Sequence, residues 1–528
     1  MDPSWVLSFP PGVSASWRAE GELTLDFADT APFCGGGNGH SERHEPRRLS
    51  PSLWQDATKM GLSPSGQLLE ETSVQAQPRG RWTLRQLPPP LPAVMLRLQY
   101  PGEVVGRLRA AVEEAALPHA SARFFYCVRE LLGGGLLQIT ASDGGRPLAT
   151  LASMTSWFAM VSGELGAQPY VLSRFAYLRR EDEQLVLESP RSAARLVCHD
   201  WRAAAAIYSF SAPVTVAAAA EFLSSQLSPD GVAQLAGLLF AAGMLLEAGS
   251  PGAPSEEDRA DLLSWEFHDL LFHARIREGR HDAARGATCR FAGQLPAPAA
   301  IKPAAAGTTV PLNRPDLERL QSDDAPLARV MEQRRSIRQY AKDPMTVQQL
   351  GEFLFRTARV RARCEADLPT SRGPARLVLT SRPYPSGGSL FPLEVYPLVQ
   401  ACNGLDPGLY HYDPAGHQLE VLAAVAPQQA MLLQRAADAA GINPATIQVL
   451  LVISARFRRV AWKYAGIAYS LILKDTGVLM QNMYLAATAM GLAPCALGLG
   501  DSDAFARAIG SNYYEETSVG EFLLGRPK

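Results

Sequence analysis

A run of basic and hydroxyl side chains lies in the C-terminal part of the sequence, at RRSIR. Arg334, Arg335, Ser336 and Arg338 combine planar guanidinium groups, which donate hydrogen bonds in pairs, with one hydroxyl. This chemistry suits a phosphate group or the polar edge of a ring. Because the chain is rich in arginine, a solvated helix end explains this run equally well when it is taken alone.

Two glycine-rich elements follow. In RPYPSGGS, which begins at Arg382, adjacent glycines allow backbone N–H groups to approach a flat ligand, and the serines add hydroxyls. The candidate contact residues of this element are Pro385, Ser386, Gly387, Gly388 and Ser389. The second element, Gly498-Leu499-Gly500, stands after a long apolar segment. Each of them is also explained as an ordinary loop.

Lys463 and Tyr464 stand in the segment AWKYAG, where a charged side chain is unexpected. Only six of the 50 basic residues are lysine. In apolar surroundings, desolvation lowers the pKa of a lysine and makes it a usable base near neutral pH. The alternative is a lysine that packs its aliphatic stem on the protein and extends its charge to water.

Composition excludes several classes of protein. The net charge of −2 gives no overall field for nucleic acid or an anionic membrane, and the longest apolar run, 232–246, is too short to span a bilayer. Seven cysteines without a C-x-x-C pair indicate a reducing compartment. His268 and His273 are five residues apart and form no metal-binding pair with each other or with His281. We therefore expect a soluble cytoplasmic protein without a metal, a nucleic-acid partner or a membrane partner.

The length of 528 residues predicts two to four domains, and the N-terminal half contains an internal repeat. Residues 5–27 resemble 170–190 in their V-L-S opening and alternating leucines. The repeated order of strands, helices and a hairpin predicts two winged-helix-like modules, at 1–160 and 165–250. The first copy carries about 50 extra residues, predicted as a poorly ordered insertion near 35–80.

The remaining sequence predicts a connecting segment followed by a last domain. A connecting helix at 255–280 and a Pro/Ala-rich linker complete the range 255–314, and an α+β domain follows at 315–528. Its expected elements are helices at 316–333, 346–363 and 469–490 and strands at 375–380, 394–401 and 449–456.

The order of RRSIR, RPYPSGGSLFPLEVYPLV, WKYAGIAY, MGLAPCALGLGD and GEFLLGRP resembles the nitroreductase superfamily. The W-K-Y element narrows the resemblance to the SagB-type branch, the azoline dehydrogenases of peptide natural-product biosynthesis. The resemblance covers 315–528 and, more loosely, the N-terminal half, where that branch carries winged-helix modules.

The resemblance implies a nitroreductase-like FMN fold and a homodimer with two flavin sites at the subunit interface. Arg334, Ser336 and Arg338 would hold the phosphate, the ribityl chain or the pyrimidine edge. Residues 385–389 would pack on the isoalloxazine ring. Backbone groups of 498–500 would contact the flavin, although Leu499 departs from the glycine expected there. Arg526 would reach the phosphate, and Lys463 and Tyr464 would handle the substrate proton.

Three functions follow as hypotheses. The first is FMN-dependent oxidation of thiazolines or oxazolines in a peptide, in which Lys463 takes a proton and the flavin takes a hydride. The N-terminal modules would then bind a leader peptide or a cyclodehydratase. The second is a nitro- or quinone-type reductase that uses NAD(P)H, and the third is a winged-helix regulator that senses redox state through FMN. The apolar helices near Leu131 and Leu239 disfavour DNA binding, which needs cations facing phosphate.

Overall fold

The computed structural model describes most of the chain, and the chain divides into two compact units, Met1–Ala283 and Ala284–Lys528. The described residues are 1–2, 4–11, 13–18, 22–27, 73–77, 81–85, 87, 90–114, 120–133, 135–155, 158–249, 256–283, 286–304, 307–370, 373–423 and 426–528. Within these ranges, no helix is long and apolar enough to cross a bilayer.

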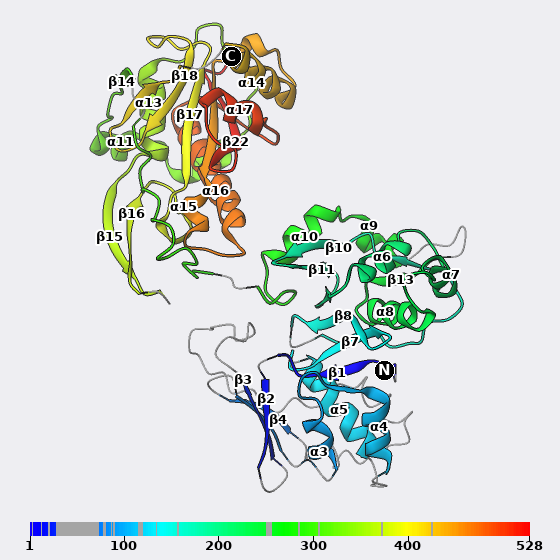
Figure 1. Ribbon diagram of the computed structural model, residues 1–528. Coiled ribbons are helices and arrows are strands. Elements are labelled where there is room, and N and C mark those ends of the chain that lie inside the picture. Colours follow the sequence, from blue (N-terminus) through cyan, green and yellow to red (C-terminus); the bar gives the residue numbers. More distant parts are fainter. Residues whose placement is uncertain are drawn as a thin grey trace. The chain divides into compact units, whose positions relative to one another are not determined.

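The first unit contains three sheets and a series of short helices (Figure 1). Its elements are β1 (Val6–Ser8), β2 (Val13–Arg18), β3 (Glu22–Phe27), β4 (Ser73–Gln77), β5 (Arg81–Arg85), α3 (Leu91–Leu96), β6 (Glu103–Val104), α4 (Val105–Glu114), α5 (Ala120–Gly133), β7 (Gln138–Asp143), β8 (Arg146–Ser153), β9 (Tyr170–Leu172), β10 (Tyr177–Glu181), β11 (Gln184–Glu188), β12 (Ala194–Cys198), α6 (Trp201–Ser209), α7 (Val216–Phe222), α8 (Pro229–Ala241), β13 (Leu245–Glu247), η1 (Glu256–Asp258), α9 (Ala260–Leu263) and α10 (Phe267–Arg275).

The internal repeat is visible in the strand pairing. In the first copy, β1 pairs antiparallel with both β6 and β7. In the second copy, β9 pairs antiparallel with β13, and Tyr170 forms a bridge with Val214. However, β8 also pairs with β12, so one seven-stranded sheet of order β10-β11-β12-β8-β7-β1-β6 includes strands from both predicted modules. The assignment of winged-helix modules stays a prediction.

Two expectations for the first unit need correction. Most of the predicted insertion at 35–80 lies outside the described residues, but 73–77 form β4, which pairs with β5 in a sheet of order β2-β3-β5-β4. The single connecting helix at 255–280 is instead η1, α9 and α10. A new helix, α10, begins after Glu266. The side chain of Glu266 accepts a hydrogen bond from the backbone N–H of His268 at 2.7 Å and so caps this helix.

The second unit is an α+β fold around a seven-stranded sheet of order β14-β19-β18-β17-β20-β22-β21 (Figure 1). Its elements are β14 (Thr309–Pro311), α11 (Leu317–Asp323), α12 (Leu327–Gln333), α13 (Val347–Ala358), β15 (Ala362–Leu368), β16 (Ala375–Ser381), η2 (Gly387–Ser389), β17 (Leu393–Val399), β18 (Gly408–Asp413), β19 (Gln418–Val421), α14 (Ala426–Ala440), η3 (Pro444–Thr446), β20 (Val449–Arg456), α15 (Phe457–Ala461), α16 (Ala468–Ala489), β21 (Ala493–Leu497), α17 (Ser502–Ile509) and β22 (Glu516–Gly525). β15 and β16 form a separate hairpin that extends from this unit as an arm.

Local sequence explains most of these boundaries. Thr346 and Gln349 form the predicted capping box at the start of α13. The helix expected at 316–333 is divided into α11 and α12, because Pro326 disfavours helical backbone at the residue before it. The segment 286–304, expected as part of a linker, packs on the second unit through hydrogen bonds described below.

Helix α16 positions the candidate site. Apolar side chains at Ile472, Leu479 and Met483 are buried against the sheet. The helix contacts both β17 and β21, which are separated in the sheet order by β20 and β22. Residues next to these two strands carry different parts of the chemistry.

Candidate active site

The arginine-rich run lies along the edge strand β21. The backbone N–H of Ile337 donates to the carbonyl of Pro494 at 2.8 Å. The hydroxyls of Ser336 and Tyr484 are 2.7 Å apart, and the backbone N–H of Ala496 donates to the hydroxyl of Tyr484 at 2.8 Å. The guanidinium of Arg334 lies over the Tyr484 ring, 5.2 Å from its centroid. Tyr484 of α16 thus fixes the run beside β21.

The C-terminal arginine joins the same region. The backbone N–H of Ala341 donates to the carbonyl of Arg526 at 2.9 Å, and the side chain of Arg526 pairs with Asp343. Arg338 lies near the thiol of Cys495. Burial raises the pKa of this thiol, and the charge of Arg338 opposes that shift. The structure therefore brings together the cationic residues that the sequence suggested, within one region beside β21. Arg335 is exposed at the surface.

The glycine-rich turn η2 is held by an aspartate of α16. The hydroxyl of Ser386 donates to Asp475 at 2.5 Å, and the backbone N–H of Gly387 donates to the other oxygen of that carboxylate at 3.1 Å. Ser386 also accepts the backbone N–H of Phe391 at 3.0 Å. Asp475 is 5% exposed, and burial raises its pKa. Pro385 immediately precedes this anchored turn.

Lys463 and Tyr464 meet this turn at Gly388. The φ angle of Gly388 is +63°, and a Cβ added there would lie 2.4 Å from the Tyr464 hydroxyl and 2.9 Å from the Lys463 Nζ. Only glycine fits this position without a shift. The next residue, Ser389, also has a positive φ of 57°. The two side chains predicted to handle a proton therefore converge on the predicted ligand-binding turn.

The surroundings of Tyr464 determine the protonation of its hydroxyl. Burial raises the pKa of Tyr464, with smaller contributions from Cys289 and Asp475, so its hydroxyl stays protonated at neutral pH and can donate a hydrogen bond. Lys463 is half-buried, and its Nζ lies 5.4 Å from the centroid of the Tyr464 ring. The complete desolvation expected for Lys463 is therefore not present.

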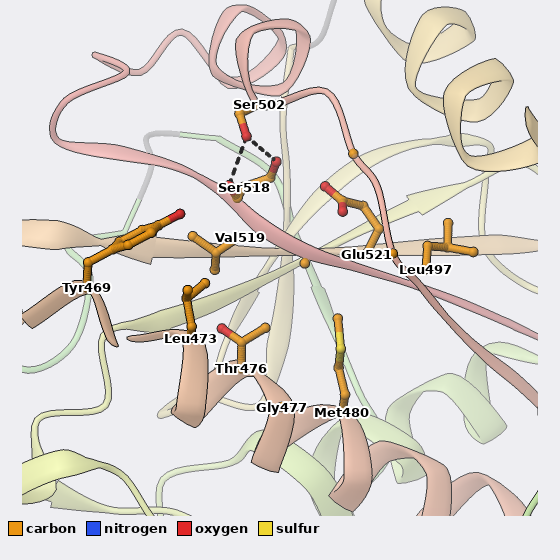
Figure 2. A pocket seen from close by; sticks show the side chains of 13 residues that line it. Tyr469, Leu473, Thr476, Gly477, Met480, Leu497, Ser502, Ser518, Val519 and Glu521 are labelled. Carbon is orange, nitrogen blue, oxygen red and sulfur yellow. Dashed lines mark hydrogen bonds between the residues drawn. The ribbon is translucent and has the colours of Figure 1, made fainter. Parts of the chain in front are cut away.

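The second glycine-rich element borders a pocket of about 380 Å³ between α16 and β22. Figure 2 shows Leu473, Thr476 and Met480 extending from α16 toward Val519 of β22. The lining residues are Tyr469, Leu473, Thr476, Gly477, Met480, Leu497, Gly498, Gly500, Ser502, Ser518, Val519, Gly520 and Glu521. Leu499 does not line the pocket, and its side chain is 76% exposed.

Gly500 has a steric reason to be glycine. A Cβ at this position would lie 2.0 Å from the carboxylate of Glu521. Glu521 is 7% exposed, and burial raises its pKa. The loop can therefore follow the pocket wall only because it lacks a side chain at this point.

The predicted site residues form two groups on opposite sides of α16. Asp475 anchors the turn that faces Lys463, and Tyr484 anchors the arginine-rich run. These two anchors are nine residues apart, which is about two and a half turns and therefore places them on opposite helix faces. The strands next to the two groups are also far apart. The turn precedes β17 and the arginine-rich run lies beside β21, and these strands are three steps apart in the sheet, about 14 Å at ~4.8 Å per step.

Three residues of this region were not identified from the sequence. Asp475 lies within the buried apolar stripe of α16, where a polar residue is a signal in itself, whereas half-buried Tyr484 carries no such signal. Glu521 lies in an apolar strand and carries the same signal. Among the described residues, no group of three His, Cys, Asp or Glu side chains could hold a metal ion.

Comparison with known proteins identifies two parts of the chain. Residues 331–525 match the nitroreductase family, and residues 170–282 match the cyanobactin oxidase ThcOx. "Putative nitroreductase MJ1384" of Methanocaldococcus jannaschii is 28% identical over 193 residues, which are 36% of this chain and 85% of that protein.

Two further likenesses concern microcin biosynthesis. The microcin B17-processing protein McbC of Escherichia coli is 32% identical over 115 residues, which are 21% of this chain and 42% of that protein. A chain of the E. coli microcin synthetase McbBCD complex with truncated pro-MccB17 has a TM-score of 0.30 and 20% identity, covering 46% of this chain and 89% of that chain. Nitroreductase-family members use FMN. Residues 331–525 therefore form a nitroreductase-family domain, and the matches to ThcOx and McbC support a likeness of this chain to the SagB-type azoline dehydrogenase branch of that superfamily.

Proposed function

We propose that this protein oxidises thiazolines or oxazolines in a peptide to thiazoles or oxazoles. The observation that carries the proposal is the convergence of Lys463 Nζ and the Tyr464 hydroxyl on Gly388. A base and a hydrogen-bond donor that lie against a glycine without a side chain suit a flat heterocycle with an acidic ring proton. The likeness to McbC and to the cyanobactin oxidase supports this substrate class.

The reaction removes one proton and one hydride from the azoline ring. FMN, when bound, supplies the hydride acceptor. Lys463 in its neutral form takes the ring proton at Nζ, and the Tyr464 hydroxyl donates a hydrogen bond that orients the heterocycle. Tyr464 suits a donor role because its raised pKa keeps the proton on the oxygen.

The residues beside β21 fit the phosphate end of FMN. Arg334, Arg338 and Arg526 offer hydrogen-bond donors with permanent charge, and Ser336 adds a neutral hydroxyl. The hydroxyl of Tyr484 already organises this run. The guanidinium of Arg526 is paired with the carboxylate of Asp343, so a phosphate that binds Arg526 must replace this carboxylate. At Gly498, which lines the pocket, a Cβ would meet no atom within 4 Å, so the backbone there leaves open space for a ring system.

The separation of the two residue groups supports a homodimeric site. One chain places the arginines and Lys463 on opposite sides of α16, so a second copy can present its Lys463 side to the arginine side of the first. The exposed part of α16 is apolar enough for such an interface: Tyr469 is 49% exposed, Leu473 is 38% and Val478 is 39%. A two-fold axis would create two equivalent sites.

The peptide substrate and a partner enzyme belong to the same proposal. We assign peptide recognition to the first unit, where the match to the cyanobactin oxidase lies. A cyclodehydratase would supply the azoline, because oxidation requires a ring that is already closed. McbC itself occurs in a synthetase complex with a precursor peptide bound.

The test is direct oxidation of a purified azoline peptide. We expect the protein to bind FMN and to convert the peptide to a product that is lighter by two hydrogen atoms, as measured by mass spectrometry. Lys463→Ala is expected to bind FMN and to lose this conversion. Steady oxidation of NAD(P)H with a nitroaromatic acceptor, unchanged in Lys463→Ala and without any azoline oxidation, would replace the proposal with a reductase.

A further inference from the structure

Residues 286–304, here called the connector, begin the described part of the second unit. Their backbone is hydrogen-bonded directly to the segment that carries Lys463. The backbone N–H of Cys289 donates to the carbonyl of Lys463 at 3.0 Å, and that of Ala465 donates to the carbonyl of Gly286 at 3.1 Å. Cys289 is 5% exposed. The connector therefore forms part of the wall behind the Lys463–Tyr464 pair.

Side chains of the two residues that flank α15 hold the connector further along. The indole N–H of Trp462 donates to the carbonyl of Leu295 at 2.9 Å. The guanidinium of Arg456 donates to the carbonyls of Ala299 and Ala300 at 2.9 and 3.2 Å. Each of these bonds uses a main-chain carbonyl of the connector, so they depend on the path of its backbone and not on its side chains.

Arg459 stands at the centre of this arrangement. It is 1% exposed, and its guanidinium donates to three carbonyls: Leu390 at 2.9 Å, Pro298 at 2.8 Å and Val378 at 2.5 Å. These carbonyls come from the segment after η2, from the connector and from β16. Burial, with the nearby charges of other arginines, lowers the pKa of Arg459 to about 10. Burial of a cation without a carboxylate partner is costly, so its three bonds must hold these segments firmly.

Arg459 is linked to both sides of the proton-handling pair. Helical bonding continues past α15, because the backbone N–H groups of Lys463 and Tyr464 donate to the carbonyl of Val460 at 3.1 and 2.9 Å. Lys463 therefore lies one turn after Arg459. Leu390 directly follows the turn that contains Gly388, against which the Lys463 and Tyr464 side chains lie.

We propose that Arg459 is a positioning residue that fixes the Lys463–Tyr464 pair against the turn at Gly388, with the connector as its third point of attachment. This inference rests on the proposed function for its kinetic readout. The planar fork of arginine is required, because a lysine ammonium cannot reach three carbonyls that are arranged around a guanidinium.

The test compares Arg459→Lys and Arg459→Met with the matched variants Arg458→Lys and Arg458→Met, whose exposed side chain lies next in sequence on α15. A displacement of about 1 Å at a reacting group costs about 10²-fold in rate. We expect kcat for azoline oxidation to fall by about 10²-fold in Arg459→Lys, with KM within about twofold and FMN content unchanged. The Arg458 variants are expected to match the parent.

A second readout does not require catalysis. With only six lysines in the chain, reductive methylation by formaldehyde and a borane, followed by peptide mass spectrometry, reports the reactivity of Lys463. We expect this methylation to be severalfold faster in the Arg459 variants. If neither variant folds, Trp462→Phe removes one connector bond, keeps the ring and is expected to shift both readouts in the same direction.

Two results separate failure of this inference from failure of the proposed function. Parental kcat and parental methylation of Lys463, together with a lower Tm, would show that Arg459 only stabilises the fold. If the parent oxidises no azoline, the proposed function fails, and the methylation rate alone still decides whether Arg459 positions Lys463.

Discussion

Two inactive variants of this protein should restore activity when they are combined in one dimer. Lys463→Ala removes the base on one side of α16, and Arg338→Ala removes a cation on the opposite side. If each site takes its lysine side from one chain and its arginine side from the other, a dimer of the two variants has one site with both substitutions and one site with neither.

The expected magnitude follows from this count. A purified heterodimer should show about one half of the parental activity per dimer, because one of two equivalent sites is intact. If both residue groups served the same site within one chain, each site would carry one substitution. The heterodimer would then be no more active than its components.

The assay uses two affinity tags on co-expressed chains and tandem purification. Azoline oxidation is then measured at an FMN concentration that loads the parent but leaves the Arg338→Ala homodimer largely empty and therefore inactive. The control heterodimer combines Arg338→Ala with Arg526→Ala. These residues lie on the same side of α16, so every site is impaired in either arrangement. Activity of the first heterodimer at the level of the single variants would refute the shared site and the reasoning from the opposite faces of α16.

Four further predictions concern single residues. Lys463→Ala should retain FMN and lose azoline oxidation, whereas Tyr464→Phe should lose less, because it removes only a hydroxyl; parental turnover of Lys463→Ala would exclude this base. Arg338→Ala should weaken FMN retention, as measured by titration of flavin fluorescence, and unchanged affinity would place the phosphate elsewhere. Gly388→Ala should fold but lose turnover, because its Cβ displaces Tyr464 and the positive φ is strained; a fully active variant would contradict the contact at this turn. Burial opposes ionisation of Glu394, but the hydrogen bond from His411 and the nearby arginines hold its pKa at about 2. Its contribution to stability is therefore present above pH 4.5 and is lost as pH falls toward 2. Chemical denaturation of Glu394→Gln should show a smaller loss of unfolding free energy over this pH range.

The sequence predicts those helices and strands that are defined by short-range patterns such as apolar periodicity and capping residues. The strand at 449–456 has the predicted bounds, and the helix expected at 469–490 is α16, because apolar periodicity and length define both. The capping box at Thr346 is likewise a short-range signal. The split at Pro326 is also a local signal, because proline disfavours helical backbone at the residue before it, although the apolar pattern alone predicts one continuous helix.

Parts of the site depend on tertiary contacts and could not be read from motifs. The motifs identify Lys463 and Arg338 as candidates, but only the fold shows that they belong to opposite sides of one helix. Asp475 and Arg459 lie outside the glycine-rich and RRSIR motifs, and their bonds connect segments about 80 to 160 residues apart. Their roles depend on carbonyls and N–H groups, which every sequence offers equally.

The bond between Gly286 and Ala465 concerns the start of the second unit. Gly286 is hydrogen-bonded two residues after Lys463, so a change in the backbone at the beginning of this unit reaches the lysine through a single contact. If the first unit binds the peptide as proposed, the peptide and the site belong to one molecule. Binding to the first unit would then raise the effective concentration of the peptide at the site without any new contact there.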